Sequence, residues 1–217
     1  MIAYKFLRRG RVGPFSGFVW PAPGGWVSAG ATDRCRRGVH ACRQQDLPWW
    51  IADELWEIEL GGEVRAAGHK LVAPAGGLVR RVRAWTSGTA QEFADACAWR
   101  TRDHAVHALR QARHPAEACA LAGSDTLGDV LAVARALADE VADARISLTI
   151  AGDGAFRALT GAPATSAYIA AHAAQRLDGR DGYEAERTWQ SCWLVDRLAL
   201  GPTGSGNRST GNGGRFG

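Results

Sequence analysis

The chain has 217 residues, and its hydrophobic fraction of 46% and charged fraction of 22% are ordinary for a globular protein. This length suffices for one large domain or two small ones, and the composition excludes wholesale disorder, collagen-like repetition and coiled coil. The net charge of +4 is uneven, because residues 1–86 hold 13 of the 26 basic residues but only 7 of the 22 acidic ones. A basic first half favours an anionic partner.

The sequence carries no signal that would place it in or across a membrane. A short apolar run precedes three arginines at the N-terminus, which is the reverse of the order in a secretory signal. No window of 18 residues lacks both charges and turn residues, so we expect no transmembrane helix. The five cysteines form an odd count without the dense spacing of a disulfide framework, so we expect reduced thiols. These features predict a cytoplasmic protein.

Up to Trp85 the sequence has the texture of β-strands, with short apolar runs between Gly and Pro turn signals such as Gly76-Gly77. In residues 55–60 apolar and acidic residues alternate, which is typical of a half-buried strand. One short helix is expected near Asp46, which would be its N-cap, with Pro48 in the first turn. The expected strands are residues 2–7, 17–20, 25–29, 38–42, 55–60, 69–73 and 78–85.

From Ser87 the apolar residues recur at steps of three and four, which predicts helices. We expect a long helix that ends before Pro115, a second capped by Thr126 and Asp129, and two more over 163–177 and 181–200, with a loop at residues 152–154. The sequence therefore predicts an α+β protein, in which an N-terminal mixed or antiparallel sheet with one short helix packs against a C-terminal bundle of about four helices. We expect domains over 1–86 and 87–200, followed by a disordered tail over 201–217.

The densest group of reactive side chains lies between Cys35 and Cys42, with His40 between them. Thiolate and imidazole ligands on one strand face could hold zinc, with His69 as a fourth ligand, but the C-x4-H-x-C spacing contains no CxxC pair. A cysteine nucleophile activated by His40 is a second hypothesis. The spacing favours a third interpretation, packed thiols around a hydrogen-bonded histidine, and we therefore predict no metal site.

Two further observations bear on function. Common metalloprotease, nucleotide-triphosphate, dinucleotide and serine-hydrolase motifs are absent from the sequence, which disfavours those chemistries. Tryptophan is abundant, with nine residues, most of them in the first half beside the arginines. Such rings either fill the core or stack a base or nicotinamide. Because Trp49 and Trp50 are adjacent, both cannot face the same core, and one is a candidate for a binding surface.

Most of residues 1–86, from Tyr4-Lys5 through Cys35-x-x-Gly38-Val39-His40 to Leu78-Val79-Arg80, resembles a group of uncharacterised actinobacterial proteins and, more loosely, a phage and bacterial domain of unknown function. The succession Gly38-x-His40, short helix, Leu55-Trp56-Glu57-Ile58-Glu59-Leu60 also looks like the centre of ADP-ribosyltransferase-like domains. That resemblance implies a split sheet that clamps NAD. His40 would take the position of the aromatic residue that stacks on nicotinamide.

The same resemblance implies catalytic roles for His40 and for Glu57, Glu59 or Glu63, and places Tyr4 and Lys5 on the first strand of the NAD site. The chain departs from the family in lacking its His-Gly-Thr element and in carrying His40 where the family has Tyr. Among the basic and aromatic residues, Arg36, Arg37 or Arg43 is a candidate for neutralising phosphate and Trp49 for stacking.

We therefore expect the chain to bind or transform a phosphate-bearing small molecule, with NAD as the candidate cofactor. The alternatives are a nucleic-acid-binding module, for which the basic half would be the footprint, and a non-catalytic accessory protein whose helical half contacts a protein partner or a second copy. An anionic small molecule is favoured over nucleic acid, because the positive charge is scattered and the helical half is mildly acidic.

Overall fold

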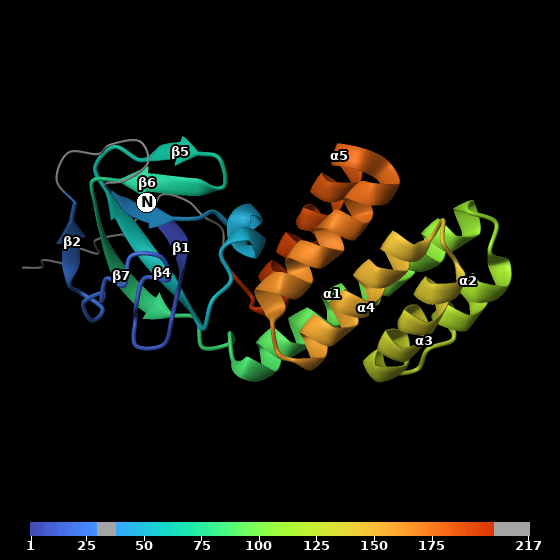
Figure 1. Ribbon diagram of the computed structural model, residues 1–217. Helices are drawn as coiled ribbons and strands as arrows, with labels where there is room; N and C mark the ends of the chain where they lie inside the picture. The colour runs from blue at the N-terminus through green and yellow to red at the C-terminus, as the bar shows by residue number, and fades with distance from the viewer. Residues whose placement is uncertain (30–37, 202–217) are drawn as a thin grey trace, which may run out of the picture.

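The structure, a computed structural model, describes residues 1–29 and 38–201. Cys35, Arg36, Arg37 and residues 202–217, which include nearly all of the expected tail, lie outside the described residues. The chain has the predicted α+β architecture, with strands at one end of the molecule and a bundle of helices at the other (Figure 1).

The strands form two antiparallel sheets, as expected for the N-terminal half. The larger sheet has the order β1-β4-β7-β2 and the smaller one the order β3-β6-β5. Their bounds are β1 Ile2–Leu7, β2 Trp26–Ser28, β3 Val39–Ala41, β4 Glu54–Gly61, β5 Arg65–Ala67, β6 Lys70–Ala73 and β7 Ala75–Arg81.

The two sheets are joined at one point and then diverge. Tyr4 of β1 and Cys42, just after β3, exchange backbone hydrogen bonds of 2.9 and 2.8 Å. Within the described part of the chain, β1 and β3 share no other backbone pairing, so a gap opens between them beyond this bridge. The inner faces of both sheets enclose an apolar core, to which β4 contributes Trp56, Ile58 and Leu60, as its alternation predicted.

Two expectations for the strands were wrong. Residues 17–20 form no strand, only an isolated bridge from Val12 to Val19, and β5 was not expected. The predicted turn at Gly76-Gly77 lies inside β7 instead. Glycine is needed at these two positions because other segments of the protein pass too close to leave room for a side chain. A Cβ atom on Gly76 would lie 2.8 Å from a methyl group of Val39, and one on Gly77 would lie 2.8 Å from the carbonyl oxygen of Gly25.

The helices begin where the sequence predicted the change of period. Thr86 caps the first long helix by accepting a hydrogen bond from the backbone N–H of Thr89, and Thr126 forms a complete capping box with Asp129. The short helix near Asp46 is a 3₁₀ helix with Asp46 in its first turn; its N-cap is Arg43, not Asp46. The helices are η1 Gln44–Trp49, α1 Ser87–Gln111, α2 Pro115–Ala122, α3 Leu127–Glu140, α4 Arg145–Leu159 and α5 Pro163–Arg197.

The bundle contains more helices than expected. Helix α2 was not predicted, and the glycines expected to mark a loop lie inside α4, where Gly154 lets the helix pass close to Thr101 of α1; a Cβ atom there would lie 3.1 Å from the threonine side chain. Element α5 is a hairpin of two antiparallel helical arms that meet at Asp178 and Gly179, which have non-helical backbone angles. Contacts between the arms, such as the bond from Gln190 to the Ala167 carbonyl, agree with the predicted pair of helices.

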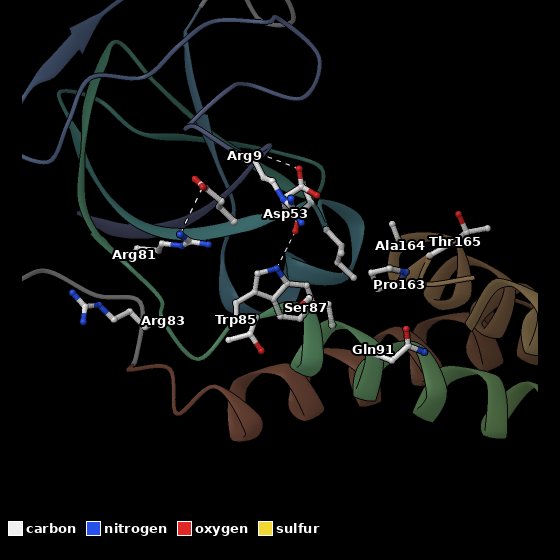
Figure 2. A pocket seen from close by; sticks show the side chains of 17 residues that line it. Arg9, Asp53, Arg81, Arg83, Trp85, Ser87, Gln91, Pro163, Ala164 and Thr165 are labelled. Carbon is white, nitrogen blue, oxygen red and sulfur yellow. Dashed lines mark hydrogen bonds and ion pairs between the residues drawn. The ribbon is translucent and has the colours of Figure 1, made fainter. Parts of the chain in front are cut away.

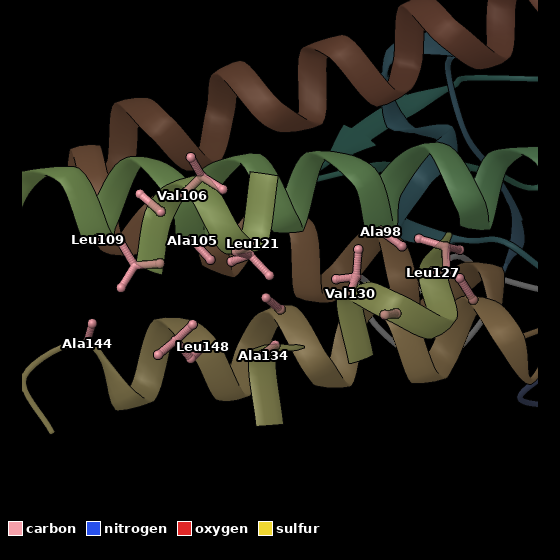
Figure 3. Close-up of a cluster of buried hydrophobic side chains, with 14 of the residues drawn as sticks. Ala98, Ala105, Val106, Leu109, Leu121, Leu127, Val130, Ala134, Ala144 and Leu148 are labelled. Atoms are coloured by element: carbon pink, nitrogen blue, oxygen red, sulfur yellow. The ribbon is translucent and has the colours of Figure 1, made fainter. Parts of the chain in front are cut away.

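Three apolar clusters hold the molecule together. The first lies among the four helices α1, α2, α3 and α4. It contains small side chains such as Ala98, Ala105 and Ala134, which allow close helix packing (Figure 3). The second lies between the sheets. The third joins the halves, because Phe6 and Leu55 of the larger sheet pack with Phe93, Ala167 and other residues of α1 and α5. Within the described residues, none of the helices is both long and apolar enough to cross a membrane.

Candidate functional site

A pocket of about 500 Å³ lies in the gap where β1 and β3 diverge. Its basic side chains are Lys5 of β1, His40 of β3 and Lys70 of β6. We call it the lysine pocket, because the chain has only these two lysines and both line it. Its other lining residues are Tyr4, Phe6, Gly13, Pro14, Phe15, Ser16, Phe18, Trp20, Val27, Ser28, Ala29, Gly38, Val39, Ala41, Cys42 and Trp50.

Lys5 spans the gap between the two strands. Its ammonium group donates to the carbonyl oxygen of His40 at 2.5 Å and lies 4.9 Å from the centre of the Trp20 ring, a cation–π contact. Burial lowers the pKa of Lys5 from 10.5 to about 8. At neutral pH most molecules therefore carry a positive charge here, and about a tenth of Lys5 is a neutral amine.

His40, which lines the same pocket, carries an unsatisfied nitrogen atom. Its Nε2 is buried and has no hydrogen-bond partner among the described residues. Burial lowers the pKa of His40, and the positive charges of Lys70 and Lys5 lower it further, so the imidazole is neutral at pH 7. Because buried polar atoms are almost always hydrogen-bonded, this nitrogen without a partner among the described residues is exceptional.

Aromatic rings form the mouth of the lysine pocket. Phe15 and Phe18 are 86% and 45% exposed, although both are large and apolar. They lie on a tight loop that is closed by a hydrogen bond from the Gly13 N–H to the Phe18 carbonyl. Phe15 makes an edge contact with Trp50 at 6.2 Å, and Phe18 makes one with Trp20 at 5.8 Å. The loop thus presents flat apolar surface beside a cationic pocket, which suits a ligand that contains a ring.

The structure brings together some of the residues predicted from the sequence and separates others. Lys5, His40 and Tyr4 line the lysine pocket, but the Tyr4 hydroxyl points away from it and donates to the Gly201 carbonyl at 2.8 Å. Glu57 lies on β4 and forms an ion pair with Arg80 at 2.5 Å. Neither Glu57 nor Glu59 lines the lysine pocket, whose described lining contains no carboxylate side chain.

The remaining predicted residues are Trp49, Arg36 and Arg37. The two arginines lie outside the described residues. Trp49 stacks on His69 at 3.9 Å and lines a different cavity, whereas its neighbour Trp50 lines both that cavity and the lysine pocket. The adjacent indoles thus share one cavity, and of the two only Trp50 also lines the lysine pocket.

The thiol of Cys42 is a weak hydrogen-bond donor, not an activated nucleophile. It donates to the Tyr4 carbonyl at 3.4 Å, and burial raises the pKa of Cys42 well above its usual value. The described residues contain no group of three His, Cys, Asp or Glu side chains that could hold a metal ion, and Cys35, the first ligand of the zinc hypothesis, lies outside them.

A larger cleft of about 1190 Å³ separates the strand end of the molecule from the N-termini of α1 and α5 (Figure 2). Arg9, Arg81 and Arg83 line it, but so do Asp53 and Glu54. The acidic groups are already engaged: Asp53 accepts from the Arg9 backbone N–H at 3.1 Å, and Glu54 lies 3.8 Å from Arg81. The cleft therefore has mixed charge, and it contains neither of the two unsatisfied buried side-chain atoms of the described chain. The lysine pocket is the better candidate site.

Sequence reasoning missed Lys70, Phe15 and Phe18 as residues of the site. Phe15 and Phe18 belong to a loop whose turn type the sequence does not specify. Lys70 carried a usable signal, because a lysine is rare in this arginine-rich chain.

The chain was compared with protein families, curated proteins and solved structures. No family model matches it, and neither a curated protein nor a solved structure is significantly similar to it.

Proposed function

We propose that this protein binds an anionic small molecule with a flat ring in the lysine pocket, and that phosphate-bearing compounds, with NAD first, are the class to test. The observation that carries this proposal is the meeting of both lysines with the unsatisfied Nε2 of His40 in one pocket. All other basic residues of the chain are arginines, so lysine is confined to this place.

The electrostatics of the pocket favour an anion. Lys5 and Lys70 supply two positive charges, His40 is neutral, and no carboxylate of the described lining offsets them. Apolar walls strengthen the attraction, because the surrounding dielectric is lower than that of water. A lysine ammonium group is a compact point charge that suits a phosphate or carboxylate oxygen.

The divergence of β1 and β3 supports NAD as the first ligand to test. The resemblance to ADP-ribosyltransferase-like domains implies a split sheet with an aromatic or imidazole ring on the strand beside the split. Here β1 and β3 separate after the Tyr4–Cys42 bridge, and His40 of β3 lines the resulting pocket. That chemistry also requires a carboxylate near the ribose, which the described lining lacks. We therefore propose binding as the function and treat cleavage of NAD as a separate question.

Thermal unfolding with NAD, ADP-ribose and nicotinamide tests the proposal directly. A ligand at one hundred times its dissociation constant stabilises the native state by about 2.7 kcal/mol, which raises the Tm of a chain of this size by about 5–10 °C. Lys70→Met should weaken the effect at least tenfold in apparent affinity. Arg110→Met is the matched control, because it removes one positive charge from the exposed face of α1.

The outcomes separate the candidate functions. Stabilisation that Lys70→Met loses and Arg110→Met keeps supports the proposal. Release of nicotinamide from NAD, abolished by His40→Ala, would extend it to an enzyme. No stabilisation by any of the three compounds, or equal stabilisation of both variants, refutes it. Salt-sensitive retention on heparin without a response to small ligands would favour the nucleic-acid alternative.

A further inference from the structure

Arg187, on the second arm of α5, carries a buried charge without a counter-ion. The residue is 3% exposed. Its Nη1 donates to the Pro48 carbonyl at 3.3 Å and to Gln190 Oε1 at 3.0 Å, and its Nε donates to the Tyr183 hydroxyl at 3.3 Å. All three acceptors are neutral. The adjacent Glu186 is engaged elsewhere, with Arg100 at 2.7 Å and His104 at 3.3 Å, and no ion pair among the described residues includes Arg187.

A guanidinium group buried in this way needs compensation. Buried charges in proteins are normally paired, since removal from water is expensive and neutral hydrogen bonds recover only part of the loss. The rings of Trp49 and Tyr183 lie 4.9 and 5.3 Å from the guanidinium carbon and provide cation–π attraction. These contacts leave a net positive charge, and none of the hydrogen bonds within the described chain uses Nη2 of Arg187.

The same guanidinium lines a cavity of about 330 Å³, which we call the Arg187 pocket. Its walls are mainly aromatic, and two of the rings are exposed: Tyr168 is 55% exposed and Phe15 is 86% exposed. The lining residues are Pro14, Phe15, Pro48, Trp49, Trp50, Ile51, Ala164, Tyr168, Tyr183 and Arg187. No acidic residue is among them, so within the described chain the pocket offers one cation and several ring faces.

We propose that the Arg187 pocket is a second binding site, which takes a small molecule with a carboxylate or phosphate group attached to a single flat ring system. The anion would supply the counter-charge that Arg187 lacks, by accepting charge-assisted hydrogen bonds from Nη2, the guanidinium nitrogen that has no partner within the described chain. The ring would pack against the aromatic walls. The volume is at the lower limit for ligand pockets, which excludes a dinucleotide. This site uses neither lysine and does not depend on the function proposed above.

Calorimetric titration with indole-3-acetate and with indole-3-acetamide tests the requirement for charge. The two probes have the same ring and nearly the same shape, but only the first is an anion. We expect the acetate to bind at least tenfold more tightly than the amide. Phenyl phosphate compared with phenol makes the same test for a phosphate, and the ratio between the two anions shows which oxygen acid the pocket prefers.

Variants locate the binding. Tyr168→Ala removes an exposed wall of the pocket and should weaken indole-3-acetate at least fivefold, whereas Phe156→Ala, which removes an exposed ring from α4, should leave it unchanged. Arg187→Met should abolish the preference for the anion. Because Arg187 also ties α5 to η1, circular dichroism must first show that this variant folds; the Tyr168→Ala and amide results stand without it.

The proposal is overturned if both anions bind no better than their neutral counterparts, if none of the four probes binds at millimolar concentration, or if Tyr168→Ala binds like the unaltered protein. Lys70→Met should bind indole-3-acetate normally. A loss of binding in Lys70→Met with normal binding in Tyr168→Ala would assign the probe to the lysine pocket and would equally refute a site at Arg187.

Discussion

Replacing Lys5 by methionine is expected to stabilise the fold while it weakens the lysine pocket. Burial lowers the pKa of Lys5 from 10.5 to about 8, so the folded state holds the charged form less favourably than the unfolded chain does. At about 1.4 kcal/mol per pKa unit, this penalty amounts to about 3 kcal/mol. The hydrogen bond from Lys5 to the His40 carbonyl returns about 1 kcal/mol, which methionine would lose. The net gain at neutral pH is about 2 kcal/mol.

The pH dependence of this gain has a definite sign. Below pH 8 Lys5 is protonated in both the folded and the unfolded state, so the penalty is present in full. Between pH 8 and 10.5 the folded protein loses this proton while the unfolded chain keeps it, and stability rises with pH wherever the unfolded state binds more protons. The advantage of Lys5→Met should therefore shrink across this window.

Urea denaturation of the unaltered protein, Lys5→Met and Arg110→Met at pH 7 and pH 9.5 measures both effects. At neutral pH Lys5→Met should have a free energy of unfolding about 2 kcal/mol higher than that of the unaltered protein, and Arg110→Met should differ from the unaltered protein by less than about 0.5 kcal/mol. The reasoning fails if Lys5→Met is less stable than the unaltered protein at pH 7, or if the difference between them is the same at both pH values.

Three further predictions address other parts of the molecule. Reductive methylation followed by peptide mass spectrometry should label Lys5 with a half-maximal rate near pH 8, provided that reagent enters the lysine pocket; a rate that still rises tenfold per unit above pH 9 would contradict the lowered pKa. Burial raises the pKa of Glu186, but hydrogen bonds from His104 and Arg100 outweigh burial and hold the pKa below its usual value. Ionised Glu186 therefore stabilises the fold at pH values above the pKa that this group has in the unfolded chain. The contribution is lost as the pH falls through the lower pKa of the folded protein. Glu186→Gln should then cost about 3 kcal/mol at pH 7 and less at pH 3.5 by urea denaturation, and a cost that does not fall with pH would show that the ion pairs contribute nothing. Gly182→Ala should destabilise by about 1–3 kcal/mol, because its Cβ would meet the Ala174 carbonyl of the other arm of α5, whereas Gly128→Ala in α3 has room and should be neutral or slightly stabilising; equal effects of the two changes would argue against the close contact of the arms.

Local patterns in the sequence predicted much of the fold. The alternation in β4, the caps at Thr86 and Thr126 and the separate helices on either side of residue 179 depend on neighbours in the chain, and the structure confirms them. The errors concern contacts between distant segments. Gly76, Gly77 and Gly154 resembled turn residues. Each instead lies where another segment of the protein passes so close that a Cβ atom on the glycine would lie within about 3 Å of it.

The candidate site was predictable only in part, for the same reason. His40, Lys5 and Tyr4 came from a local resemblance, and they meet because β1 and β3 share a bridge that the sequence does not encode visibly. Lys70 stood out as a rare residue type, but the sequence did not show that it would lie in the same pocket as Lys5 and His40. Arg187 had no signal at all, because a single arginine in a helix looks like a solvated residue until the hairpin of α5 and the 3₁₀ helix η1 enclose it.

The helix η1 is hydrogen-bonded to the helical bundle. Two of its carbonyl groups accept hydrogen bonds from the second arm of α5. Ser191 donates to the Gln45 carbonyl at 2.7 Å, and Arg187 donates to the Pro48 carbonyl. Trp49, the last residue of η1, and Trp50, which follows it, both line the Arg187 pocket, and Trp50 also lines the lysine pocket. A 3₁₀ helix of six residues has too few internal hydrogen bonds to fix such positions by itself. The second arm of α5 therefore supports the segment that carries both indoles, and α5 contributes Tyr168, Tyr183 and Arg187 directly to the Arg187 pocket.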